Sequence, residues 1–229
     1  MDSHAAVISH EAGEHSHLQH HFENVEQQKD AATIGMWVFL VTEVMFFGGL
    51  FLAYFVYRQA YPAAFASASN KTNLLIGAFN TTVLICSSLT MALAVNAAAT
   101  SKRKLTVLFL AMTLLLGGAF LGVKAYEYHD KYVHHEIPGL NFECEGCADA
   151  QHAPLFFSLY FGMTGLHASH MIVGFVLLVI LIVRANRGAF SAEYHTPVEL
   201  FGLYWHFVDI VWIFLFPLLY LIDRSAPPR

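Results

Sequence analysis

A carboxylate stands in the middle of the first apolar run of the chain, GMWVFLVTEVMFFGGLFLAYF, which extends from Gly35 to Phe55. At 1.5 Å per helical residue, Glu43 lies about 14 Å into a membrane-spanning helix, where an ionised carboxylate costs at least a few kcal/mol. We therefore expect Glu43 to be neutral or paired. Two interpretations stay open from the residues alone: a group that handles protons, and a protonated glutamate that hydrogen-bonds across a helix contact.

Further polar groups lie at similar depth in later apolar runs. In TGLHASHMIVG, His167 and His170 stand three residues apart, and in LYWHFVDIVWIFLFPLLYL so do His206 and Asp209. An earlier apolar run carries Asn80. Residues three apart share a helical face, and lipid offers polar groups no partners. We therefore predict that these side chains face the interior of a helical bundle.

A metal site is one alternative for such a set, since two histidines and an aspartate are a familiar ligand combination. No spacing here demands the open positions or shaped cavity of a haem or copper centre, so we predict no metal in this chain. For His206 and Asp209 we favour a hydrogen bond within one helix that fixes the histidine tautomer. Gly118 and Gly122 form a GxxxG, which is weak evidence for a packing face.

The N-terminal stretch holds six of the fourteen histidines: His4, His10, His15, His17, His20 and His21. A weak metal-chelating tail is conceivable, but we favour a mobile or surface-lying polar tail that becomes helical near the membrane.

Cys144 and Cys147 form a CxxC that lies near four more histidines, His129, His134, His135 and His152. The spacing matches no strong zinc template and lacks the following histidine of c-type haem attachment. On an oxidising outer face, a disulfide between the two cysteines is favoured over zinc or free thiols.

The composition is typical of a polytopic membrane protein, because 56% of the 229 residues are hydrophobic and only 13% are charged. The net charge of -5 is spread over loops and tails, which leaves no long basic face for nucleic acid. Residues 1–33 contain no apolar run and no small-residue cleavage site. We therefore expect no cleaved signal peptide, and the first span then serves as the insertion signal.

Five stretches reach the roughly 20 residues that a helix needs to cross a bilayer core. They are Ile34–Tyr57, Leu74–Ala98, Leu105–Tyr128, Leu155–Val183 and Leu200–Ile222. We predict an all-α integral membrane protein, a bundle of five transmembrane helices. The predicted regions are a His-rich tail (1–33), the transmembrane domain (34–222) with a CxxC loop inside it (129–154), and a C-terminal tail (223–229).

Orientation follows from charge clustering, because Lys and Arg divide equally between the two sides, six on each. One short loop holds Lys102, Arg103 and Lys104, another holds Arg184 and Arg187, and both lie on the N-terminal side. The positive-inside rule then predicts a cytoplasmic N-terminus, with the 129–154 loop and the C-terminus outside.

Five motifs, in order and on successive spans, resemble subunit III of the haem-copper cytochrome c oxidases: TEVMFFGGLF, FNTTVL, KAYEY, TGLHASHMIVG and LYWHFVDIVWIFLF. The resemblance extends from about Gly35 to Tyr220. It implies a chain without redox centres, bound to subunit I beside subunit II, with the haems and copper in these partners. It also implies that the chain holds phospholipid in a cleft and sustains proton uptake. The five-helix form, without the two N-terminal helices of the mitochondrial form, implies a bacterial inner membrane.

Residue by residue, the resemblance assigns Glu43 to the family's buried, carbodiimide-reactive carboxylate and Glu127 to the glutamate of its EY motif. His206 and Asp209 correspond to the histidine and aspartate of the family's HFVD motif. His167 and His170 correspond to the family's paired histidines. Arg184 stands where family members place a basic residue near lipid phosphate.

Alternatives remain within this family and outside it. Within it, the chain could be subunit III of a quinol oxidase or of a nitric-oxide-reductase-associated complex. From another class, it could be a stand-alone proton-coupled transporter built around Glu43, His167, His170 and Asp209.

Overall fold

Six α-helices make up the part of the chain that the computed structural model describes, residues 22–139, 142, 147 and 149–222. They are α2 (Val25–Ala60), α3 (Pro62–Ser69), α4 (Leu74–Ala99), α5 (Arg103–Val133), α6 (Ala153–Asn186) and α7 (Thr196–Tyr220). No strand occurs in these residues. Every helix except α3 is long and apolar enough to cross a membrane. The prediction of an all-α membrane protein with five spanning helices is confirmed.

The helices begin and end where local sequence signals place them. Helix α2 starts inside the predicted tail, because the Asn24 side chain accepts a hydrogen bond from the Gln27 amide at 2.7 Å. The Asn73 side chain caps α4 in the same way. Helix α3 lies in the connection between the first two predicted spans, where Pro62 suits a first helical turn. Residues 1–21 and 223–229 of the two tails lie outside the described residues.

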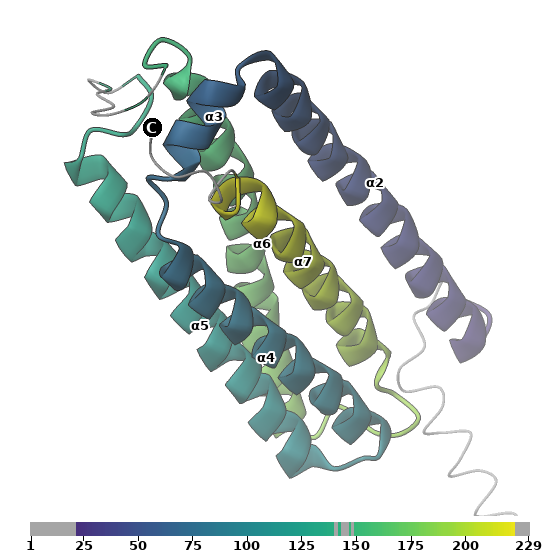
Figure 1. Ribbon diagram of the computed structural model, residues 1–229. Coiled ribbons are helices and arrows are strands. Elements are labelled where there is room, and N and C mark those ends of the chain that lie inside the picture. Colours follow the sequence, from purple (N-terminus) through teal and green to yellow (C-terminus); the bar gives the residue numbers. More distant parts are fainter. Residues whose placement is uncertain (1–21, 140–141, 143–146, 148, 223–229) are drawn as a thin grey trace, which may run out of the picture.

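Four helices form the centre of the bundle, and α2 lies at its side (Figure 1). Helix α4 packs against α5 and α7, and α6 packs against the same two helices. Helix α2 packs against α6 and α7. Its buried residues are Leu40, Phe47 and Tyr54. Helix α3 packs on α6, with Phe65 between Tyr54 and Phe156. The first span is therefore the least embedded of the five.

The closest helix packing surrounds Trp205 of α7. A Cβ added at Gly117 of α5 or at Gly174 of α6 would lie 3.0 Å from indole atoms. The indole N–H donates to the Ser87 hydroxyl of α4 at 3.0 Å. Trp205 thus links all four central helices, and the two glycines make room for it.

The GxxxG pair is not the packing face of α5. A Cβ at Gly118 would meet Phe175 at an ordinary 3.6 Å, and a Cβ at Gly122 would meet nothing within 4 Å. The close approach belongs to Gly117, which lies on a different side of the helix.

Substituting Gly174→Leu is expected to destabilise the bundle by about 1–3 kcal/mol, because the new side chain must displace Trp205. Gly162→Leu on the same helix is the matched control, since a Cβ there meets nothing within 4 Å. Thermal unfolding of the detergent-solubilised protein compares the two. Equal midpoints for both variants would contradict the packing argument.

Candidate functional site

Glu43 has its partner on another helix of the same chain. Its Oε2 lies 3.1 Å from Nε2 of His170 on α6. The other ring nitrogen, Nδ1, lies 2.9 Å from the backbone carbonyl of Leu166, one turn earlier. Phe47 packs beside the imidazole, with 5.4 Å between ring centroids. The pair joins α2 to α6, so a hydrogen bond across a helix contact, one of the two interpretations left open by the sequence, is present.

The geometry fixes where the protons of this pair lie. A carbonyl oxygen only accepts, so Nδ1 of His170 carries a proton. A second proton lies between Nε2 and Glu43, because without it two acceptors would face each other. The pair is then a neutral acid and imidazole, or a carboxylate and imidazolium, and neither form has a net charge. This neutrality reduces the cost of placing Glu43 in a membrane.

The Glu43–His170 pair is only partly covered by the chain itself. The side chains of Glu43 and His170 are 18% and 16% exposed. Groups outside the chain can therefore reach the shared proton, as exchange requires.

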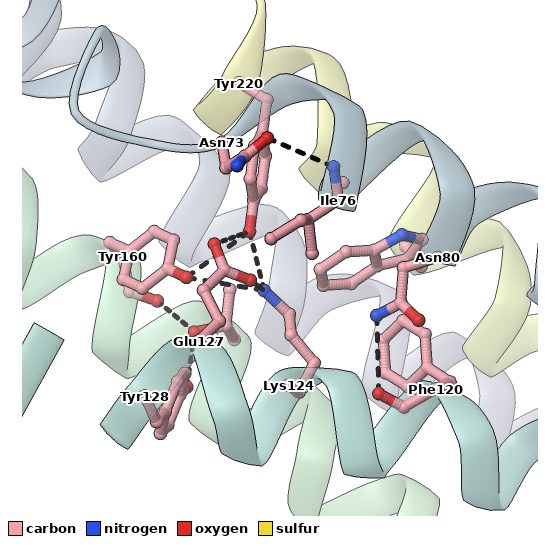
Figure 2. A network of polar contacts seen from close by, with 12 residues as sticks. Asn73, Ile76, Asn80, Phe120, Lys124, Glu127, Tyr128, Tyr160 and Tyr220 are labelled. Carbon is pink, nitrogen blue, oxygen red and sulfur yellow. Dashed lines mark hydrogen bonds and ion pairs between the residues drawn. The ribbon is translucent and has the colours of Figure 1, made fainter. Parts of the chain in front are cut away.

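A second ionic site lies wholly inside the bundle (Figure 2). The Lys124 ammonium on α5 lies 2.8 Å from Oε2 of Glu127, one turn later. It also donates to the Tyr220 hydroxyl of α7 at 2.7 Å, and this hydroxyl donates to Oε1 of Glu127 at 2.5 Å. The Tyr160 hydroxyl of α6 is 3.3 Å from that of Tyr220. Side chains from three helices therefore converge on one ion pair.

Aromatic rings complete the surroundings of the ammonium. Lys124 lies 4.6 Å from the centroid of a Trp212 ring, a cation–π contact. Lys124 and Glu127 are 5% and 6% exposed. Each charge thus faces its counterpart and a hydroxyl, as a buried ion pair requires. The prediction had included Glu127 but not Lys124. A lysine and a glutamate three residues apart in an apolar run could have indicated this ion pair, because such residues are neighbours on a helix.

The other predicted intramembrane residues also face inward. Asn80, His167 and Asp209 are buried, and the Asn80 amide donates to the Phe120 carbonyl at 3.3 Å. His167 packs between the rings of Phe120 and Trp212, and its two nitrogens have no hydrogen-bond partner in the described part of the chain. The prediction that the polar residues face the interior is confirmed for Asn80, His167 and Asp209.

The predicted hydrogen bond between His206 and Asp209 is absent. Nδ1 of His206 lies 2.7 Å from the Ser88 hydroxyl of α4. Both carboxyl oxygens of Asp209 are without a hydrogen-bond partner among the described residues. The prediction was wrong because a hydroxyl of the neighbouring helix competes for the histidine.

The loop between α5 and α6 is only partly described. Cys147 is disulfide-bonded, but Cys144 lies outside the described residues, so their pairing stays a prediction. His152 stacks on Tyr61, with centroids 3.9 Å apart, and its Nδ1 lies 2.8 Å from an Asp149 carboxyl oxygen. The hydrogen bond from His152 lowers the pKa of Asp149. Within the described residues no group of three or more His, Cys, Asp or Glu is arranged to hold a metal.

Arg184 stands apart from both ionic sites. It lies in the last turn of α6, is exposed, and its guanidinium lies 5.4 Å from the centroid of the Phe190 ring. The structure thus leaves this cation at the surface, where the resemblance places a lipid phosphate.

Five spanning helices with ionisable groups paired inside the bundle define a multi-pass helical membrane protein. Its sequence matches the family described as cytochrome c oxidase subunit III over residues 8–223. The chain belongs to this family, and it is therefore subunit III of a haem-copper oxidase complex.

Relatives agree with the family assignment along most of their length. The chain is 30% identical over 203 residues to cytochrome c oxidase subunit 3 of Thermostichus vulcanus, covering 88% of this chain and 92% of the relative. The protein of the same name from Synechocystis is 34% identical to this chain over 194 residues, which cover 84% of this chain and 76% of the relative. Cytochrome bo(3) ubiquinol oxidase subunit 3 of Pseudomonas aeruginosa is 27% identical over 217 residues, which cover 95% of this chain and 97% of the relative.

Replacing Lys124 with Met is expected to destabilise the subunit by about 3–5 kcal/mol, because Glu127 would lose its counter-charge inside the bundle. Adding Glu127→Gln should recover part of this loss, since no unpaired charge then remains. Thermal release of subunit III from the purified complex measures both effects. The exposed Lys104→Met on the same helix is the control, and a single variant as stable as the control would contradict the assignment.

Proposed function

We propose that this chain is subunit III of a cytochrome c oxidase, which reduces oxygen to water and pumps protons across a bacterial inner membrane. The identities favour this oxidase type: two cytochrome c oxidase relatives reach 30% and 34%, against 27% for the ubiquinol oxidase relative. In this proposal the chain is an accessory subunit. Subunits I and II are its partners, and the haems and copper belong to them.

Support for proton uptake comes from the Glu43–His170 pair, the observation that carries the functional proposal. One proton is shared between two groups on different helices, at 3.1 Å, and the pair stays neutral whichever group holds it. The pair is also reachable from outside the chain. A shared proton with an accessible edge can be delivered to a neighbouring subunit or taken from one.

The proposal includes phospholipid as a ligand. Arg184 presents an exposed cation at the end of a spanning helix, where lipid phosphates lie. The orientation proposed is a cytoplasmic N-terminus. Lys102, Arg103 and Lys104 at the junction of α4 and α5, and Arg184 and Arg187 at the end of α6, cluster positive charge on the N-terminal side.

A stand-alone proton-coupled transporter has less support. That hypothesis requires Glu43, His167, His170 and Asp209 to form one site, but of these four residues only Glu43 and His170 are hydrogen-bonded to each other, at 3.1 Å. His167 instead packs on Phe120 and Trp212.

The electron donor is tested on the purified complex. We expect rapid oxygen consumption with reduced cytochrome c and slow consumption with a quinol, together with haem and copper absorption from copurifying subunits. Turnover with quinol alone would instead identify a quinol oxidase. Purification of the chain without haem-containing partners would refute the complex.

The proton role is tested with Glu43→Gln. The amide can still hydrogen-bond to His170 but cannot give up a proton, so assembly should be normal. We expect slower proton delivery or faster loss of activity during turnover, measured by proton uptake and by the decay of oxygen consumption. Thr42→Val, at the neighbouring exposed position, is the control. Wild-type proton uptake and lifetime in Glu43→Gln would make the pair a packing element only.

A further inference from the structure

Five side-chain atoms in the middle of the bundle are buried without a hydrogen-bond partner among the described residues. They are Oδ1 of Asn80, both ring nitrogens of His167 and both carboxyl oxygens of Asp209. The three residues are 1%, 1% and 4% exposed, so solvent and lipid outside the bundle do not reach them. Buried polar atoms are almost always hydrogen-bonded, because an unpaired one costs free energy. A ligand that supplies the missing hydrogen bonds is therefore expected.

The three residues lie around one indole, that of Trp212 on α7. Asp209 precedes Trp212 by three residues and so lies one turn earlier on the same helical face. The His167 imidazole of α6 and the Phe120 ring of α5 lie 5.1 and 4.8 Å from the indole, between ring centroids. The Asn80 amide nitrogen of α4 donates to the Phe120 carbonyl (Figure 2). Helices α4, α6 and α7 thus each bring an incompletely paired polar side chain to this place.

The polar groups closest to these atoms already have other partners. The indole N–H of Trp212 donates to the Thr81 hydroxyl at 3.1 Å. The Ser88 hydroxyl approaches the Asp209 carboxyl without making a hydrogen bond to it, and lies 2.7 Å from Nδ1 of His206. The missing hydrogen bonds are therefore not supplied by the side chains nearby.

The chemistry of the unpaired atoms indicates the ligand. A neutral imidazole has one donor and one acceptor nitrogen, the Asn80 oxygen only accepts, and a carboxyl group accepts or, when protonated, also donates. Water complements such a mixture, because each molecule both donates and accepts. A metal ion does not fit, since the described part of the chain has no group of three or more His, Cys, Asp or Glu arranged to hold one.

The dimensions of the site also suit water. Two hydrogen bonds of about 2.8 Å let one water join atoms up to about 5.5 Å apart. The three residues from Asp209 to Trp212 rise about 4.5 Å along α7, and His167 packs at the level of Trp212. A single water can therefore bridge the levels of Asp209 and His167.

A polar hollow between the starts of α2 and α7 offers water a way in. Its volume is about 480 Å³, and its lining includes Lys29, Glu199 and His206. Nδ1 of His206 faces the Ser88 hydroxyl, and Asp209 lies one turn beyond His206 on α7. The His206–Ser88 contact is therefore the polar step between the hollow and the Asp209 carboxyl.

We propose that ordered water molecules bind inside the bundle between Asp209, His167 and Asn80, and exchange with the hollow past the His206–Ser88 contact. These waters provide partners for the five buried atoms and join α4, α6 and α7 through hydrogen bonds. The site is separate from the Glu43–His170 pair, because both ring nitrogens of His170 are already engaged. The proposal does not depend on which electron donor the oxidase uses.

Radiolytic labelling of the purified complex tests the site without any substitution. An X-ray pulse converts bound water to hydroxyl radicals, which oxidise the adjacent side chains, and mass spectrometry locates the products. We expect oxidation of Phe120 although its ring is fully buried. Phe65 and Phe156, equally buried and packed on each other, are the matched controls and should stay unmodified. A Phe120 ring as unreactive as these two would overturn the proposal.

Substitution of Asp209 tests whether its carboxyl holds the water. Asp209→Leu should reduce the oxidation of Phe120, because one polar partner of the water is lost. Asp209→Asn should retain it, since an amide still hydrogen-bonds to water. Equal oxidation of Phe120 in the two variants would overturn the assignment of water to this carboxyl.

The route is tested by mixing the complex rapidly with water enriched in oxygen-18 before the X-ray pulse. The heavy oxygen then enters the Phe120 product only as fast as the internal water exchanges. His206→Phe should slow this incorporation, because the polar step from the hollow is lost. His134→Phe, at an exposed position after α5, is the control and should exchange as the wild type does. Equal incorporation rates in both variants would overturn the route.

Discussion

The Lys124–Glu127 ion pair is the contact on which the arrangement of the bundle depends, because opposite charges buried inside a bundle are tolerated only while both keep their partners. Tyr220, the last residue of α7, supplies the bridging hydroxyl. The end of α7 must therefore be held in place. The Tyr54 hydroxyl of α2 and the Ser69 hydroxyl of α3 donate to two of its last carbonyls. Helices α2 and α3 thus support the ion pair without touching it.

Much of this fold could be predicted because hydrophobic length is a local property of the sequence. The five spans and the inward direction of Asn80, His167 and Asp209 follow from the poor solvation that lipid offers. Helix ends were less predictable, since a hydrogen-bonded helix continues past the hydrocarbon. Helix α2 accordingly begins at Val25 rather than Ile34.

Contacts between helices could not be predicted, because they depend on how each helix is rotated. Glu43 and His170 are separated by 127 residues, and no local pattern relates them. One residue corresponds to a rotation of about 100°, which is why Gly117 rather than Gly118 packs against Trp205. Lys124 is a different case. Its spacing to Glu127 can be recognised in the sequence, because the two residues are only three apart. A lysine near the end of an apolar run is, however, easily assigned to the membrane–water interface.

The two ionic sites differ in the stability of the helices that hold them, and this difference bears on their roles. Lys124 and Glu127 belong to the central bundle and contact side chains of three helices, so exchanging a proton there would disrupt the core. Glu43 belongs to α2, which buries only three residues against its neighbours, and elements with few buried contacts open most readily. Proton exchange is compatible with the loosely held pair and incompatible with the tightly held one.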